Sequence, residues 1–97
     1  MGEPVRAVDA ERMGLVNRVV PAGTHLDEAK RLARLIADRP PLAVRLGKEA
    51  VNQAMEMGLG PGLEFERKLF YLLFASEDKR EGMRAFLEKR PGRFTGR

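Results

Sequence analysis

Two groups of carboxylates are the first candidates for acid–base chemistry in this chain. Glu64 and Glu66 are two residues apart, and Glu77, Asp78 and Glu81 lie close together further along. Helical residues two apart point in different directions, and carboxylates in a first helical turn are favoured by the helix dipole without any catalytic role. Neither group is flanked by the apolar residues that poise a catalytic carboxyl group. We therefore interpret both groups as structural and predict no catalytic residue.

Metal and cofactor chemistry has little support in the sequence. His25 is the single histidine and the chain has no cysteine, which excludes a histidine cluster, a thiolate metal site and disulfides. The glycines of residues 58–62 follow no expected strand and lack the Lys-Ser/Thr of a phosphate-binding loop, so they indicate a linker. The sequence predicts neither a metal site nor a resident cofactor.

A cluster of cations marks the expected end of the last helix. Lys89, Arg90 and Arg93 follow one another there. Cations at a helix C-terminus complement the helix dipole, and this explains them without a ligand. Contact with a phosphate-bearing ligand such as coenzyme A is the functional alternative. Aromatic residues at helical spacing are core residues by default; they are Phe70, Phe74 and Phe86.

The elements that must position these side chains are mostly helical. Apolar periodicity and the Gly and Pro punctuation predict an all-α fold of four to five helices with a short extended segment at residues 15–20. The expected helices cover residues 7–13, from Thr24 to before Pro40, from Pro41 to before Gly58, residues 63–75, and from a cap at Ser76 or Asp78 to before Pro91. Gly14 is placed to end the first helix.

Two segments require neighbours that the rest of the sequence does not supply. Leu15–Val20 is rich in β-branched residues, and a lone strand cannot satisfy its own backbone. Residues 69–75 are apolar almost all round, so their helix should be buried on more than one side. We expect the chain to self-associate, because exposed apolar patches of this kind are unusual in monomers.

Composition indicates one small globular unit. The chain has 97 residues, and 18 Lys and Arg stand against 14 Asp and Glu for a net charge of +4. The positive charges are interleaved with acids, so a basic nucleic-acid-binding bundle is only a weak alternative, and we predict no nucleic-acid partner. No apolar run has the length of a membrane helix, and no secretion signal is visible. Together with the absence of cysteine, this predicts a cytoplasmic protein without membrane contact.

The chain also resembles the enoyl-CoA hydratase/isomerase (crotonase) family over nearly its whole length. Residues 74–90 resemble the family's closing helix, F-A-[ST]-E-D-x-x-E-G-M-x-A-F-x-E-K-R. Residues 2–21 resemble its T-G-x-x-[IV]-x-A-x-x-A and G-L-V-x-x-V-x-P motifs, and residues 41–52 resemble its P-x-A-V-x-x-x-K-x-x-[VL]-N helix. Residues 66–70 lead into the closing helix as they do in the family. Four motifs in the right order make the resemblance specific.

This resemblance implies that residues 1–97 are the family's C-terminal helical oligomerisation domain. The family's N-terminal β/α spiral domain, which supplies the oxyanion donors and catalytic glutamates, is not expected here. Hydration of 2-trans-enoyl-CoA in fatty-acid β-oxidation is the implied parental reaction, with this chain inactive alone and serving oligomerisation and cover of the acyl-CoA site. Whether the chain should count as an enzyme is left open, because the family's catalytic residues have no counterparts in it.

The same resemblance supplies candidate contacts and partners. Lys89 resembles a lysine that reaches the coenzyme A phosphates or ribose, and Phe70 and Phe86 resemble residues near the ligand pocket. A coenzyme A thioester is therefore the implied ligand. The implied partners are copies of this chain or full-length crotonase-like subunits. A helical protein–protein interaction module without any ligand is the alternative.

Overall fold

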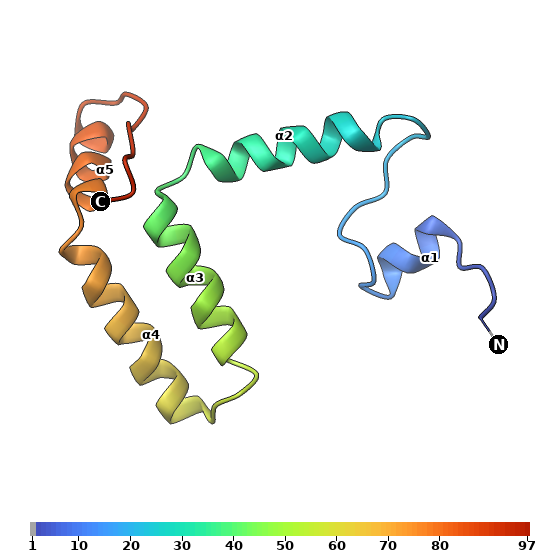
Figure 1. The fold of residues 1–97 in the computed structure, drawn as a ribbon, viewed down its shortest axis with the longest axis horizontal. Coiled ribbons are helices and arrows are strands. Elements are labelled where there is room, and N and C mark those ends of the chain that lie inside the picture. Colours follow the sequence, from blue (N-terminus) through green and yellow to red (C-terminus); the bar gives the residue numbers. More distant parts are fainter. Residues whose placement is uncertain (1) are drawn as a thin grey trace. The chain divides into compact units, whose positions relative to one another are not determined.

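A computed structural model describes residues 2–97, which form five α-helices (Figure 1). The helices are α1 (Ala7–Arg12), α2 (His25–Ala37), α3 (Pro41–Gln53), α4 (Leu59–Phe74) and α5 (Glu77–Leu87). No strand occurs within these described residues. The all-α prediction is confirmed. Two compact units, Met1–Ala33 and Arg34–Arg97, divide the chain inside α2.

In the first unit, α1 ends at Gly14 as predicted. The Gly14 N–H donates to the carbonyl oxygen of Glu11 at 3.0 Å, and the Leu15 N–H donates to that of Ala10 at 2.9 Å. These two bonds form a Schellman motif, which places the residue after the cap in the left-handed conformation. Gly14 has φ 75, a conformation that glycine adopts without a Cβ clash.

The segment Leu15–Val20 satisfies part of its backbone inside the first unit. It bends at residues 15–17 and has no regular structure at residues 18–20. The Val19 N–H donates to Oε1 of Glu11 at 3.1 Å, and the Val16 N–H donates to the carbonyl oxygen of Ala10 at 3.4 Å. The segment therefore makes these contacts without the partner strand that the sequence argument required.

A charged cluster joins this segment to the start of α2. Glu28 accepts hydrogen bonds from Nε and Nη2 of Arg31 at 2.9 and 2.7 Å, and it also pairs with Arg18. The Arg31 hydrogen bond, helped by Arg18, lowers the pKa of Glu28 to about 2. Thr24 precedes α2 as predicted, but its hydroxyl donates to the carbonyl oxygen of Pro21 at 2.7 Å and no hydrogen bond from α2 to that hydroxyl is seen.

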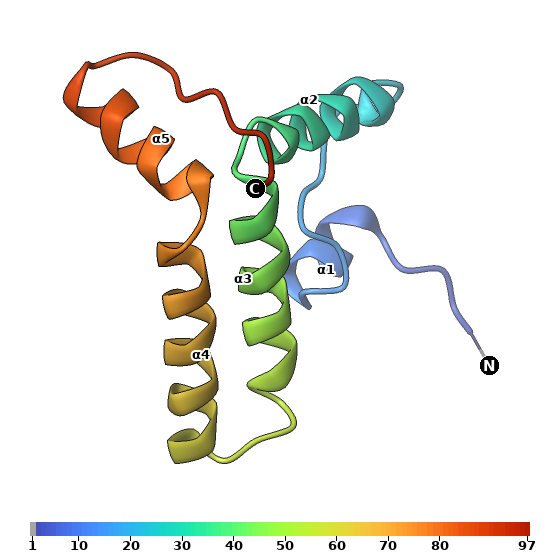
Figure 2. The same cartoon turned by 60° about the vertical axis from the view of Figure 1, so that its left-hand side comes forward.

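In the second unit, α3 and α4 pack side by side and run in opposite directions (Figures 1 and 2). Pro41 occupies the first turn of α3 as predicted, where a missing backbone N–H costs nothing. Each helix buries one leucine, Leu46 on α3 and Leu69 on α4. Burial of a leucine contributes roughly 1.5–3 kcal/mol, so this pair is a small core.

Helix α4 begins earlier than the sequence predicted. Residues 58–62 were expected to break the chain, but Leu59 already starts the helix and Gly58 precedes it with an extended backbone. Pro61 lies in the first helical turn, where its missing N–H has no intrahelical partner to lose. The Gly62 N–H donates to the carbonyl oxygen of Gly58 at 2.9 Å. The linker prediction for these residues is therefore wrong.

Candidate functional site

The end of α5 is a Schellman motif built around a lysine. The Lys89 N–H donates to the carbonyl oxygen of Phe86 at 3.2 Å, and the Arg90 N–H donates to that of Ala85 at 3.0 Å. Lys89 has φ 51 and is the single non-glycine residue with positive φ in residues 2–97. The left-handed conformation costs an L-residue about 1–2 kcal/mol, which is why glycine usually stands here. A lysine kept in this conformation is a candidate functional residue.

Phe86 and Lys89 share this turn, so the structure brings together two of the three predicted ligand contacts. The Phe86 side chain is 81% exposed and Lys89 is exposed as well. No ion pair to Lys89 is seen among the described residues. The two side chains therefore present an aromatic ring and a free cation at one helix end.

Phe70, the third predicted contact, lies with another cluster. It is on α4, 54% exposed, and its ring meets that of Phe74 edge to face at 5.0 Å between centroids. Nζ of Lys79 lies over the Phe74 ring, 4.5 Å from its centroid, and Lys79 is in the first turn of α5. Lys89 lies beyond the other end of α5, since the helix ends at Leu87. Phe70 is thus near the opposite end of α5 from Lys89.

The sequence pattern predicted Phe70, Phe74 and Phe86 as core residues, but all three are exposed in this structure. Leu59, Leu63, Phe70 and Phe74 are all exposed and follow the spacing of one helical face, which we call the α4 apolar face. Next to its first half is a cavity of about 430 Å³. The residues lining it are mainly small or apolar: Ala50, Val51, Ala54, Met57, Gly58, Leu59, Gly62, Leu63 and Glu66. The expected burial of residues 69–75 on more than one side is therefore absent, since α3 is the helix that packs on α4.

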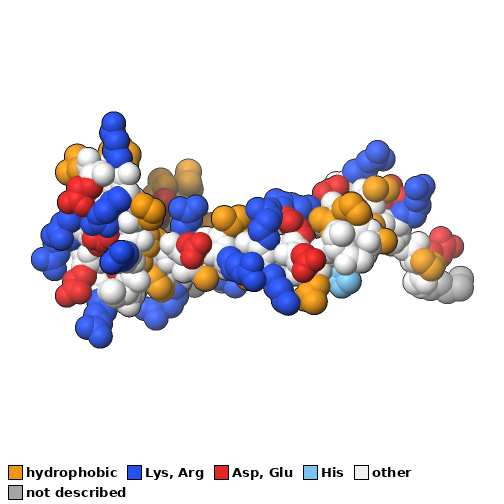
Figure 3. Space-filling view, turned by 90° about the horizontal axis from the view of Figure 1, so that it is seen from above, with side chains coloured by type: hydrophobic (Ala, Val, Ile, Leu, Met, Phe, Trp, Pro, Cys, Tyr) orange, Lys and Arg blue, Asp and Glu red, His pale blue; other side chains and the backbone are white. Residues whose placement is uncertain are grey.

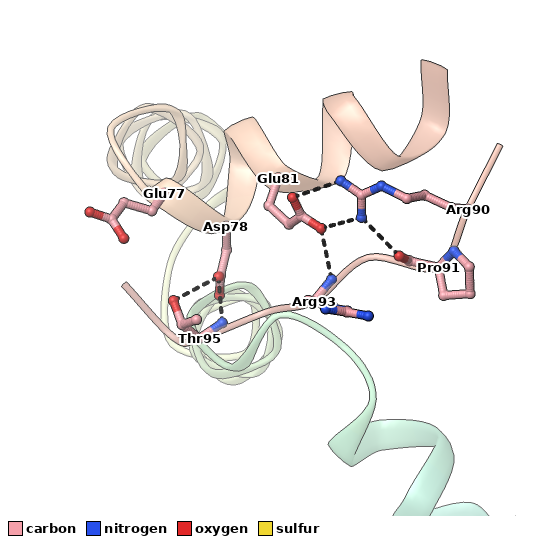
Figure 4. Close-up of a pocket in the computed structure, with 7 residues that line it drawn as sticks. All are labelled: Glu77, Asp78, Glu81, Arg90, Pro91, Arg93 and Thr95. Carbon is pink, nitrogen blue, oxygen red and sulfur yellow. Dashed lines mark hydrogen bonds and ion pairs between the residues drawn. The ribbon is translucent and has the colours of Figure 1, made fainter. Parts of the chain in front are cut away.

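Arg90 is committed to carboxylates of its own chain (Figure 4). Its Nη1 and Nη2 donate to Glu81 at 2.6 and 3.1 Å, and its Nε donates to Glu88 at 2.5 Å. Glu81 also accepts the backbone N–H of Arg93 at 2.9 Å. In this structure the Arg90 guanidinium is thus paired with two carboxylates of its own chain. Sequence reasoning missed this pairing, because it interpreted Glu81 as a carboxylate favoured by the helix dipole.

The electrostatics of this pair follow from its geometry. The side chain of Glu81 is 19% exposed. The Arg90 hydrogen bonds, and after them the Arg93 N–H, lower the pKa of Glu81 to about 2. The same contact raises the pKa of the Arg90 guanidinium, with Glu88 adding to the effect. Both groups stay ionised across the physiological range, so this pair is an ion-pair fastening and not an acid–base couple.

The helix cap is Ser76, and Asp78 is free for another role. Oγ of Ser76 accepts the backbone N–H of Lys79 at 3.1 Å, as an N-cap residue does. Asp78 is 3% exposed and turns toward the C-terminal residues. Asp78 borders an open cavity of about 620 Å³, which is lined by Glu77, Asp78, Glu81, Arg90, Pro91, Arg93 and Thr95 (Figure 4).

Charge is mixed over the surface. Figure 3 shows Lys and Arg side chains interspersed with Asp and Glu on the visible face. Residues 2–97 contain no group of three acidic, histidine or cysteine side chains placed to hold a metal ion. Nor does any helix of this described part combine the length and apolar character that crossing a membrane requires.

Comparison with known proteins gives one consistent result. The family model described as enoyl-CoA hydratase/isomerase matches residues 1–97. A Mycobacterium bovis protein named probable enoyl-CoA hydratase echA8 is 51% identical over 96 residues, which are 99% of this chain and 37% of that protein. The 2,3-dehydroadipyl-CoA hydratase of Escherichia coli is 45% identical over 96 residues, 99% of this chain and 38% of that protein.

Solved structures agree with the sequence matches. An enoyl-CoA hydratase crystal structure from Geobacillus kaustophilus has a TM-score of 0.87 and 57% identity, covering 94% of this chain and 35% of that one. The enoyl-CoA hydratase EchA1 of Mycobacterium marinum has a TM-score of 0.91 and 35% identity, covering 99% of this chain and 39% of that one. The chain thus spans well under half the length of each of these relatives.

Proposed function

This chain belongs to the enoyl-CoA hydratase/isomerase family, and from that premise we propose that it is a helical segment that assembles with crotonase-like subunits, copies of itself included. The observation that carries the proposal is the α4 apolar face, which α3 leaves uncovered. Its four large side chains, Leu59, Leu63, Phe70 and Phe74, would each gain roughly 1.5–3 kcal/mol on burial. Four large exposed apolar side chains on one helical face are typical of an interface.

We further propose that the assembled protein uses the end of α5 to contact an acyl-CoA. Lys89 is exposed, has no ion-pair partner in the described residues and keeps a left-handed backbone that disfavours lysine. Phe86 lies in the same turn and offers a ring surface. Phe70 would meet a different part of an elongated ligand, since it lies near the other end of α5. The coenzyme A named in the relatives' activities supports this ligand class.

The reaction of the assembled protein would be hydration of an enoyl-CoA, the activity for which the relatives are named. Such chemistry needs donors placed for the thioester oxyanion and a general acid–base group. Asp78 and Glu81 are occupied by hydrogen bonds to residues 90–96, and Glu64 pairs with Arg67 at 3.1 Å. We propose that this chain alone does not catalyse hydration.

Light scattering on the purified chain tests the assembly. We expect an oligomer at micromolar concentration, and Phe70→Ser should lower its mass because it removes a large exposed apolar side chain from the face. Lys68→Ser is the matched control, since it alters an exposed residue of the same helix outside the face. A folded wild-type monomer of 10.9 kDa would overturn the proposal. An oligomer that does not bind coenzyme A would instead support the alternative function, a protein–protein interaction module without ligand.

A further inference from the structure

The last residues of the chain have no helix or strand, yet they are fastened to α5. The backbone N–H groups of Thr95 and Gly96 donate to Oδ1 and Oδ2 of Asp78 at 2.7 and 2.8 Å. The Asp78 N–H donates in turn to the carbonyl oxygen of Arg97 at 3.0 Å. Both carboxylate oxygens of Asp78 are thus used, and the residue is 3% exposed. Hydrogen bonds to an ionised acceptor are stronger than neutral ones.

A second fastening lies one turn further along the helix. The Arg93 N–H donates to Oε1 of Glu81 at 2.9 Å. Asp78 and Glu81 are three residues apart, so they lie on the same face of α5. Both accept hydrogen bonds from the backbone between Arg93 and Gly96 (Figure 4). The three short contacts all use backbone N–H groups; the Thr95 hydroxyl adds only a contact of 3.4 Å. We call residues 92–97 the strap.

The Phe94 ring of the strap lies close to two glycines, Gly92 in the strap and Gly82 on α5. A Cβ added at Gly92 would lie 2.5 Å from Cζ of Phe94, whereas one added at Gly82 on α5 would lie 3.6 Å from its Cε1. The ring therefore covers Gly82 at ordinary contact distance and leaves no room for a side chain at Gly92. At its far end the strap reaches α3, since a Cβ at Gly96 would lie 3.6 Å from Cγ of Pro41.

We propose that the strap is a positioning device in which Asp78 and Glu81 hold the chain after α5 and thereby keep Lys89 in its left-handed conformation. The chain must reverse direction between Glu88 and Arg93 for the Arg93 N–H to reach Glu81. Lys89 supplies that reversal with φ 51. When the strap is released, only the two hydrogen bonds of the Schellman motif favour the reversal, and Lys89 relaxes to a conformation that lysine prefers.

A simpler cause would be the Schellman motif alone, since its two hydrogen bonds also involve Lys89. The two explanations differ in what happens when the strap is detached. If the helix end is sufficient, Lys89 keeps its positive φ. If the strap is responsible, Lys89 loses it. The presentation of the Lys89 side chain to a ligand rests on the proposed function, but the conformation of its backbone does not.

Asp78→Asn/Glu81→Gln in the full chain tests the proposal, because the new amide groups place N–H donors where Asp78 accepts the Gly96 N–H and where Glu81 accepts the Arg93 N–H. Glu66→Gln/Glu77→Gln is the matched control: it makes the same charge change at two exposed residues for which no side-chain hydrogen bond is seen in the described residues. NMR without ligand gives two readouts, namely amide exchange of Thr95 and Gly96, and the H–N–Cα–H coupling with the Cα shift of Lys89. Wild type and Glu66→Gln/Glu77→Gln should show protected amides and a left-handed Lys89.

In Asp78→Asn/Glu81→Gln we expect the protection of Thr95 and Gly96 to fall about tenfold or more, and the Lys89 signals to move to right-handed or averaged values. Should this variant unfold α5, Asp78→Ala/Glu81→Ala gives the same two readouts with a residue of high helix propensity at both positions, and Glu66→Ala/Glu77→Ala is its control. Unprotected Thr95 and Gly96 in wild type, or a left-handed Lys89 after the strap detaches, would overturn the proposal. Failure of coenzyme A binding would overturn the proposed ligand role of Lys89 and leave these readouts unchanged.

Discussion

Arg90 turns back along α5 to bind Glu81, nine residues earlier in the chain, through hydrogen bonds of 2.6 and 3.1 Å. The contact closes the turn after the helix and places the Arg93 N–H on the same carboxylate, at 2.9 Å. One acidic side chain thus joins the middle of the helix, its end and the beginning of the strap. Lys89, in contrast to Arg90, has no ion-pair partner among the described residues.

The first prediction concerns pH. The pKa of Glu81 is lowered from 4.5 to about 2, chiefly by Arg90. A depressed carboxyl pKa adds stability above the unfolded-state value, and this contribution is lost as pH falls through the folded value. The free energy of unfolding should therefore decrease between about pH 4.5 and about pH 2, and less steeply in Glu81→Gln. Thermal unfolding followed by circular dichroism across this range measures both slopes.

Glu77→Gln is the control for that experiment, since it removes a carboxylate of the same helical turn that is exposed in the structure. It should keep the wild-type slope. Glu28, whose pKa is also lowered to about 2, contributes equally to all three proteins and cancels in the comparison. Equal slopes for wild type and Glu81→Gln would contradict the prediction.

The second prediction separates the backbone of Lys89 from its side chain. Lys89→Gly should stabilise the folded chain by about 1 kcal/mol, because glycine adopts the left-handed conformation without a Cβ clash. Lys89→Ala should leave stability within about 0.5 kcal/mol of wild type, since alanine has the same Cβ. Urea unfolding of the three proteins provides the comparison. A destabilised Lys89→Gly would mean that the side chain, not the backbone, supports the fold.

The third prediction concerns coenzyme A. Any binding by this chain should be at best millimolar, a free energy of about −4 kcal/mol, and should weaken with salt because the contacts are exposed. Lys89→Ala should lose it, whereas Lys48→Ala, which removes the same charge from an exposed position on α3, should not. Calorimetric or NMR titration of coenzyme A measures this. Equal responses in the two variants would remove the ligand role from Lys89.

The fourth prediction is that crotonyl-CoA hydration by the purified chain stays at the background rate. An oxyanion site and a general acid–base group are each often worth ~10²-fold or more in rate, and the carboxylates of Asp78 and Glu81 are occupied by hydrogen bonds to residues 90–96. A spectrophotometric hydration assay tests it. A rate above background that Glu64→Gln or Glu66→Gln abolishes would assign a catalytic site to this chain.

Local features of the fold were predictable because they depend on neighbours in sequence. Gly14 ends α1, Pro41 opens α3 and Ser76 caps α5, and each acts through its own backbone or within one helical turn. The start of α4 was missed although it is also local. Gly and Pro in residues 58–62 were read as breakers, but the first turn of a helix tolerates them, and periodicity cannot distinguish the two cases.

By itself, the sequence determined the helical class, the order of the helices and the family, because apolar period, caps and motifs are properties of short segments. The tertiary structure alone decided what the charged residues of α5 do. Arg90 and the Arg93 N–H reach Glu81, and the strap reaches Asp78, only after the chain has reversed at Lys89. Sequence spacing does not encode such a contact, because its distance depends on a backbone dihedral angle that lysine seldom adopts.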